Sequence, residues 1–429
     1  MLNGNFLIIR RVWGHLSRGS LERDIRSYFV GRIFIAIVLF WSVPLLTRGL
    51  GIESYGRLSL LLLIANWIPP VIGGWLQQGI LRYHKTYSAK FADYWKTLDR
   101  VQLLLVPLGV GLAITASSLI ARATVLERCL LGGVAAFRLL RMSYASVAQA
   151  ELRPSLVVWS ELARSALPVC ILGATMIVGS FTVAFVVGCF LFGALCASVV
   201  PYFCLDQIRI NGGRFNGLIV GKMFRYGLPL TMWFGLSMGQ IVLGRFILER
   251  YELREALGMY SAYQDFITKG ATFLFMPITY ALHGQAMASW AKGEYGASKV
   301  AIRRASAYQF AIAAGLMCVV IIGYPWINAI LWGQTHYGID ASGRVLLILI
   351  SLALCVGNLG LVAHKGLELA EQTRRMAVVM GVCLTMNLFV AMYLVESHGA
   401  IGIAIGLCCG NGCYFVTSQM LSMRFLRNY

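Results

Sequence analysis

The sequence predicts an all-α integral membrane protein with about 12 transmembrane helices. Composition is the first reason, because 58% of the 429 residues are hydrophobic and only 13% are charged. A soluble domain carries about 45–50% apolar and about 25% charged residues. The remaining polar residues could not cover a soluble surface, so lipid must solvate the chain. A span with its connection takes roughly 30–35 residues, which leaves no room for an appended soluble catalytic domain.

The apolar runs are the second reason. They are continuous rather than alternating, which favours helices over a membrane barrel. Twelve such runs are predicted as spans: 28–47, 58–79, 101–121, 129–150, 154–178, 181–204, 226–248, 256–280, 306–332, 345–364, 376–395 and 399–422.

The basic residues predict which ends of the spans face the cytoplasm. With the N-terminus inside, 24 of the 37 Lys and Arg residues fall in inner segments and 7 in outer ones, a positive-inside distribution with both termini cytoplasmic. Most of the net charge of +19 is therefore topological, and nucleic-acid binding is excluded. The predicted segments are a cytoplasmic tail 1–27, a six-helix bundle 28–204, a cytoplasmic linker 205–225, a second six-helix bundle 226–422 and a cytoplasmic tail 423–429.

The two halves carry similar motifs about 200 residues apart. Y-G-R-L-S-L at 55–60 follows the first span, and L-G-M-Y-S-A at 257–262 follows the seventh. Because an even number of spans separates them, both halves have the same orientation. This predicts a pseudo-two-fold axis along the membrane normal, with the bundles forming a V around a central cationic cavity. Corresponding positions include Gly56 with Gly258 and Ser59 with Ser261.

Eight charged residues fall inside the predicted spans. They are Arg32, Arg138, Arg141, Arg164, Arg245, Lys269, Glu161 and Asp265. A base at the bilayer centre costs roughly 2.5–3.5 kcal/mol, so six facing lipid would exceed a typical stability of about 5–15 kcal/mol. These bases must snorkel, pair or line water.

Spacing within helices suggests some of the partners. Glu161 and Arg164 are three residues apart, and Asp265 and Lys269 are four apart, so each pair shares a helix face. Each pair is either a neutralised pair without function or a carboxylate that gates a basic partner. Arg141 lies near a span end, where it can snorkel.

Three of the bases, Arg32, Arg138 and Arg245, have no acidic residue within their own predicted spans. We expect them to line the cavity. The six bases form the candidate site for an anionic substrate, because guanidinium forks suit phosphate oxygens.

Catalytic and metal-binding patterns are missing from the sequence. No Walker loop occurs, and the six His residues have no metal-site spacing. The 11 cysteines sit almost entirely in apolar runs, where Cys behaves as a small hydrophobe. We expect no catalytic residue, metal or cofactor, and energy from an ion gradient or substrate flux. Glu161 and Asp265 are the candidates for H⁺ or Na⁺ coupling.

Five patches of sequence resemble one family in order and spacing. They are L-L-T-R-G-L-G-I-E-S-Y-G-R-L-S-L at 45–60, G-W-L-Q-Q-G-I-L-R-Y at 74–83, R-Y-G-L-P-L at 225–230, A-L-G-M-Y-S-A-Y at 256–263 and G-A-I-G-I-A-I at 399–405. The chain thus resembles the polysaccharide transporter family (Wzx-type flippases) of the multidrug/oligosaccharidyl-lipid/polysaccharide exporter superfamily.

The resemblance implies two six-helix bundles around a cationic cavity. It also implies movement of polyprenyl-pyrophosphate-linked oligosaccharide units across the bacterial inner membrane for O-antigen, capsule or exopolysaccharide synthesis. A polysaccharide polymerase and a chain-length regulator are the implied partners. Family members often carry Asp just before the seventh-helix Arg, whereas this chain has Gly244 before Arg245. An ion-coupling role for that Asp therefore cannot be carried over.

Other functions stay open at this point. A drug/cation antiporter of the same superfamily fits the fold, but the excess of in-span bases argues against cationic drugs. A lipid II flippase usually has more than twelve spans. A membrane-embedded polysaccharide polymerase or ligase needs a sizeable outer loop, and the longest predicted outer connection here has roughly a dozen residues.

Overall fold

The computed structural model describes residues 21–87, 91–120, 123–151, 153–176, 179, 181–205, 213–333 and 341–427, without the side chains of 21–32, 91, 154, 280–281 and 283–284. Every regular element within these ranges is a helix. The helices are α2 Leu21–Leu50, α3 Ile52–Tyr87, α4 Phe91–Ser118, α5 Val125–Ala150, α6 Pro154–Thr175, α7 Val183–Cys204, α8 Gly217–Arg250, α9 Arg254–Ala291, α10 Tyr295–Trp332, α11 Ala341–Ala363, α12 Lys365–Leu369 and α13 Thr373–Arg427.

Helix α13 contains two spans joined by a sharp turn. Gly399 lies at the turn with φ 53° and ψ −130°, a conformation that glycine adopts without a side-chain clash. The chain then packs back on itself, since a Cβ at Gly406 would lie 2.9 Å from the Cβ of Ala391. With α13 counted as two spans and the short α12 left out, the predicted number of about twelve spans is confirmed.

Two of these spans, α5 and α9, carry four of the charged residues singled out above. Among the described residues, nine helices are long and apolar enough to cross a membrane. Helices α5 and α9 lie outside that set, because side chains such as Arg138, Arg141, Asp265 and Lys269 interrupt their apolar sequence. These two less apolar spans therefore each hold residues of the candidate site.

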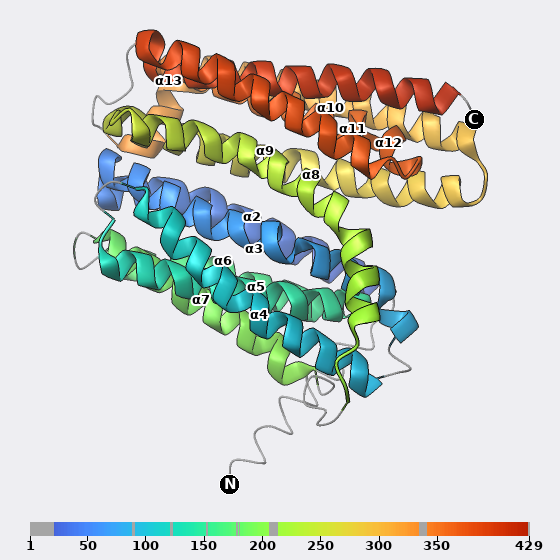
Figure 1. The fold of residues 1–429 in the computed structure, drawn as a ribbon. Coiled ribbons are helices and arrows are strands. Elements are labelled where there is room, and N and C mark those ends of the chain that lie inside the picture. Colours follow the sequence, from blue (N-terminus) through green and yellow to red (C-terminus); the bar gives the residue numbers. More distant parts are fainter. Residues whose placement is uncertain are drawn as a thin grey trace.

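The helices form two groups in Figure 1, α2–α7 and α8–α13. Helix α8 bends and reaches the first group with its N-terminal part (Figure 1). Pro229 lies within α8, where a proline removes a backbone hydrogen bond and favours a bend. Met223 packs into a buried cluster with Trp75 and Tyr94 of the first group. Residues 217–225, assigned to the linker from the sequence, thus belong to a helix shared by both groups.

The helices also extend into the predicted tails. Helix α2 begins at Leu21 and α13 ends at Arg427, so residues 21–27 and 423–427 are helical. The rest of both tails lies outside the described residues, as do residues 206–212 of the predicted linker.

The duplicated glycines meet at the junction of the two groups. A Cβ built on Gly56 would lie 2.8 Å from the backbone nitrogen of Gly258, and one on Gly258 would lie 2.2 Å from the Ile52 carbonyl oxygen. Neither position has space for a side chain. Equivalent residues can touch in this way only close to a two-fold axis, as the repeat predicts.

Candidate functional site

The charged residues inside the spans gather in two clusters. The N-terminal cluster consists of Asn66 on α3, Arg138 and Arg141 on α5, and Glu161 and Arg164 on α6. The junction cluster consists of Tyr55 and Ser59 on α3, Arg245 on α8, and Gln264 and Asp265 on α9. The side chain of Arg32, on α2, lies outside the described residues.

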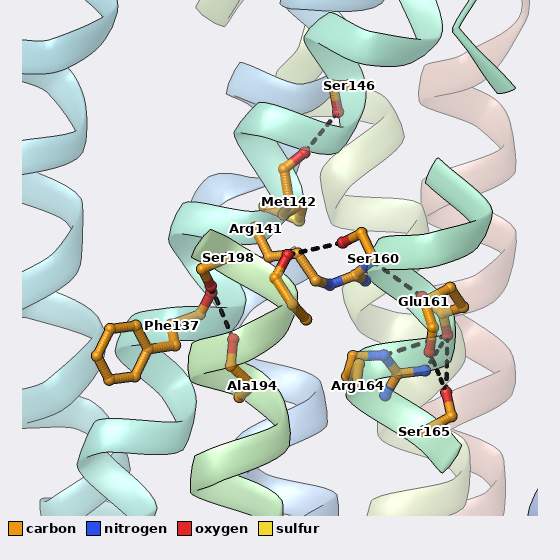
Figure 2. A network of polar contacts seen from close by, with 11 residues as sticks. Phe137, Arg141, Met142, Ser146, Ser160, Glu161, Arg164, Ser165, Ala194 and Ser198 are labelled. Carbon is orange, nitrogen blue, oxygen red and sulfur yellow. Dashed lines mark hydrogen bonds and ion pairs between the residues drawn. The ribbon is translucent and has the colours of Figure 1, made fainter. Parts of the chain in front are cut away.

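Glu161 binds two arginines of the N-terminal cluster, Arg141 and Arg164 (Figure 2). Its Oε2 is 2.9 Å from Nη1 of Arg141. Its Oε1 accepts a 3.1 Å bond from Nε of Arg164 and a second bond from Nη2 of the same side chain. The predicted Glu161–Arg164 pair is therefore present. Arg141, expected to snorkel, instead points across to the same carboxylate.

Helix geometry brings these residues to one level of the membrane. Arg138 and Arg141 are three residues apart on α5, as are Glu161 and Arg164 on α6, so each pair shares a helix face. Arg141 precedes the end of α5 by about as many residues as Glu161 follows the start of α6. At 1.5 Å per residue, both lie roughly 10–14 Å from the connecting turn. The cluster thus lies about two helical turns or more from the connecting turn, within the predicted spans.

The N-terminal cluster carries more positive charge than its acid can neutralise. Arg138 is buried and donates only to the amide oxygen of Asn66, and its Nε has no hydrogen-bond partner among the described residues. Three guanidinium groups against one carboxylate leave an excess charge of two. The side chains of Arg141 and Arg164 are 19% and 21% exposed. These two guanidinium groups are therefore not sealed within the packed helices.

The junction cluster joins helices from both groups around an ion pair. Arg245, only 1% exposed, places Nη2 2.7 Å from Oδ1 of Asp265. Its Nε donates to Oε1 of Gln264 at 2.8 Å, and its Nη1 donates to the Ser59 hydroxyl. The hydroxyls of Tyr55 and Ser59 each donate to Oδ2 of Asp265 at 2.8 Å. Every nitrogen of this guanidinium is engaged within the protein.

Two sequence-based expectations about this region differ from what the structure shows. Arg245, expected to line the cavity because its own span holds no acid, is 1% exposed and ion-paired with Asp265 of another helix. Asp265, expected to pair with Lys269, is bound by Arg245 instead, while Lys269 Nζ donates to the Ser42 hydroxyl on α2 at 3.0 Å. The reason is that the guanidinium fork arrives from a neighbouring helix and satisfies the carboxylate together with two hydroxyls of α3.

Further contacts join the two groups at the same end of the molecule. The Thr47 hydroxyl donates to the carbonyl oxygen of Leu331 at 2.7 Å, and Nη2 of Arg48 donates to that of Ala329 at 2.7 Å. Both connect the end of α2 to the end of α10. No sequence pattern indicates these two bonds, because their acceptors are backbone carbonyls. By the predicted topology, this is the outward-facing end.

The contact between α3 and α8 continues toward the other end. Trp67 Nε1 donates to the carbonyl oxygen of Gly235 at 2.9 Å, and a Cβ on Gly227 would lie 2.3 Å from the Trp75 carbonyl oxygen. The contacts of α2 with α9 are formed by Phe40 with Phe266, whose ring centroids are 4.4 Å apart, and by Lys269 with Ser42.

Among the described residues, no group of three or more His, Cys, Asp or Glu side chains could hold a metal ion. The eleven cysteines are all free thiols. The chemistry available in the two clusters is therefore that of guanidinium groups, carboxylates and hydroxyls, which bind anions or exchange protons.

No family model and no curated protein sequence matches the chain. Solved structures do. An inward-facing multidrug resistance MATE family transporter of the MOP superfamily aligns with a TM-score of 0.77 at 14% identity, covering 93% of this chain and 99% of its own. An outward-facing multidrug resistance MATE family transporter of the MOP superfamily aligns with a TM-score of 0.68 at 16% identity, covering 97% of this chain and 98% of its own. The lipid II flippase MurJ in an inward closed conformation aligns at 0.69 and 12% identity, covering 94% and 91%.

These similarities extend over nearly the whole of each chain at low sequence identity. They agree with the helix order and the two groups of helices described above. The protein therefore has the two-lobe, twelve-span fold of the MATE transporters and the MurJ flippase of the MOP superfamily.

Proposed function

We propose that the protein is a transporter that flips polyprenyl-pyrophosphate-linked oligosaccharide units across the inner membrane of a bacterium, with both termini in the cytoplasm. One observation carries the proposal. The N-terminal cluster places three arginines against one carboxylate inside the membrane, with Arg141 and Arg164 partly exposed. Such a site is costly in lipid unless an anion balances it.

The pyrophosphate group of the proposed ligand would balance the excess positive charge of the N-terminal cluster. A pyrophosphate diester carries two negative charges, and guanidinium forks bind its oxygens with charge-assisted hydrogen bonds. The polyprenyl tail would remain in lipid, because each buried CH₂ favours the apolar phase by about 0.8 kcal/mol. The sugars would pass between the two groups of helices.

Alternating access supplies the movement in this proposal. The junction cluster, Thr47 and Arg48 hold the predicted outer end closed, which suits loading from the cytoplasmic side. The higher TM-score with the inward-facing than with the outward-facing MATE structure agrees with this state. Opening the outer end breaks the bonds from Tyr55 and Ser59 to Asp265. Proton or Na⁺ binding at that carboxylate would weaken them, which makes Asp265 the coupling candidate.

The test is a depletion experiment in the native host. Lipid-linked repeat units should accumulate on the cytoplasmic face of the inner membrane, and long polymer should disappear. Wild-type protein should restore both, whereas an Arg141→Ala/Arg164→Ala variant at equal abundance should not. Unchanged lipid intermediates and polymer would contradict the proposal.

The same experiment separates the alternatives. Accumulation of lipid II with normal surface polysaccharide would indicate a lipid II flippase, like the structural neighbour MurJ. Increased sensitivity to cationic drugs alone would indicate a multidrug transporter. Repeat units that reach the outer face without being polymerised would indicate a polymerase or ligase.

A further inference from the structure

The carboxylate of Glu161 is arranged as an anionic ligand would be. Its two oxygens serve different arginines, Oε1 binding Arg164 and Oε2 binding Arg141. The Ser165 hydroxyl donates to the backbone carbonyl of Glu161 at 2.7 Å and lies 3.5 Å from Oε1. A bridging phosphate would offer the same two oxygens to the same two guanidinium groups.

The two bonds differ in a way that matters for exchange. Arg164 comes from the same helix and binds Oε1 through two nitrogens, whereas Arg141 comes from α5 and binds Oε2 through Nη1 at 2.9 Å. The Glu161–Arg141 bond therefore spans two helices, and both side chains are partly exposed, at 15% and 19%. An incoming oxygen can replace it without separating Glu161 from Arg164.

The empty cluster also needs an anion of its own. Three guanidinium groups held together without a counter-charge would repel one another and bear the full cost of desolvation. A carrier must also release its cargo, so a site that bound pyrophosphate with three uncompensated arginines would turn over slowly. An internal anion that returns as the ligand leaves solves both problems.

We propose that Glu161 is an internal counter-anion that competes with the cargo's pyrophosphate for Arg141. In the empty state Glu161 bridges Arg141 and Arg164. In the loaded state a phosphate oxygen takes its place on Arg141, while Arg138 supplies the charge that Glu161 never neutralises. This role rests on the proposed function, because it assumes a pyrophosphate-bearing substrate at this cluster.

Binding to the purified full-length protein in lipid nanodiscs tests the competition directly. The probes are inorganic pyrophosphate and farnesyl pyrophosphate. Glu161→Gln should bind both about tenfold more tightly than wild type, about the value of one charge-assisted contact, and should release them more slowly. Glu161→Gln combined with Arg141→Gln should lose the gain, because the contested donor is then missing.

A matched control is available on α5. Glu127 is a buried carboxylate 3.1 Å from Nη2 of Arg57, and it also caps the start of that helix, a role that glutamine can fill. Glu127→Gln should leave both affinities unchanged. Glu161→Asp, which keeps the charge on a shorter side chain, should give an intermediate affinity and covers the case in which Glu161→Gln does not fold.

The outcomes separate this inference from the function on which it rests. Tighter binding in Glu161→Gln alone supports the counter-anion role. Equal or weaker binding in a folded Glu161→Gln protein overturns that role and leaves the proposed function standing. If neither wild type nor Glu161→Gln binds either probe, both fall.

Discussion

Both charged clusters are built from arginine and carboxylate side chains, but they differ in the ratio of the two and in how fully each guanidinium is bound. In the junction cluster, one arginine with 1% exposure meets one carboxylate that is 24% exposed, and every nitrogen of the guanidinium has a partner. In the N-terminal cluster, three arginines share one carboxylate and two of them remain about one-fifth exposed. A guanidinium whose nitrogens are all bound within the protein holds helices together, whereas arginines that outnumber their carboxylate are suited to an anionic ligand. In the proposed mechanism, the engagement of each guanidinium and the ratio of arginines to carboxylates therefore separate the two clusters.

The largest expected effect is on stability, at Arg245. We expect Arg245→Ala to lower the free energy of unfolding by about 3 kcal/mol, because Asp265 is then left without its guanidinium partner. Arg164→Ala should cost less, since Glu161 keeps Arg141. Thermal unfolding followed by size-exclusion chromatography in detergent compares the two. Equal losses would remove the distinction between the clusters.

The next effect is on transport. Arg141→Ala/Arg164→Ala should reduce flipping of lipid-linked oligosaccharide in proteoliposomes by at least about 100-fold, since two charge-assisted contacts of about 1.5–3 kcal/mol each are lost. The corresponding double Lys variant keeps the charge but not the fork, and should retain a measurable fraction of activity. Full activity in the alanine variant would exclude the N-terminal cluster as the substrate site.

A smaller effect is expected on the conformational equilibrium. Asp265→Asn removes the charge that accepts bonds from Tyr55, Ser59 and Arg245, so the outward-open population should rise about tenfold, or about 1.4 kcal/mol. Electron spin resonance distances between labels at Glu53 and Arg250 would measure it. Glu161→Gln, the matched change in the other cluster, should leave those distances unchanged. An identical response in both variants would contradict the separate roles.

The smallest expected effect concerns one neutral hydrogen bond. Thr47→Val keeps the side-chain shape but removes the bond to the Leu331 carbonyl oxygen, which should shift the same equilibrium by about 1 kcal/mol or less. The same pair of labels measures this shift. A response larger than that of Asp265→Asn would show that the α2–α10 contact, rather than the ion pair, controls the outer end.

The sequence predicted the features that depend on residues close together in the chain and missed the contacts that depend on tertiary packing. Hydropathy and the positive-inside count led to twelve spans, because membrane insertion depends on each segment. The Glu161–Arg164 pair was predictable because helix geometry alone brings residues three apart together. Asp265 had an equally good candidate in Lys269, yet its partner Arg245 comes from α8. The choice between Arg245 and Lys269 as the partner of Asp265 depends on how α3, α8 and α9 pack. Sequence spacing cannot reveal that packing, since Ser59, which also binds Asp265, lies 206 residues from it in the chain.

The contact of Gly56 with Gly258 has a mechanical consequence. Two helices that meet through bare backbone have no interlocking side chains to withdraw when they separate, and no rotamers to reorder when they return. In the proposed movement of the two lobes, this crossing therefore offers little steric resistance, and the surrounding polar bonds set the barrier. The two lobes would turn about this crossing, and the charged residues beside it would hold the closed conformation.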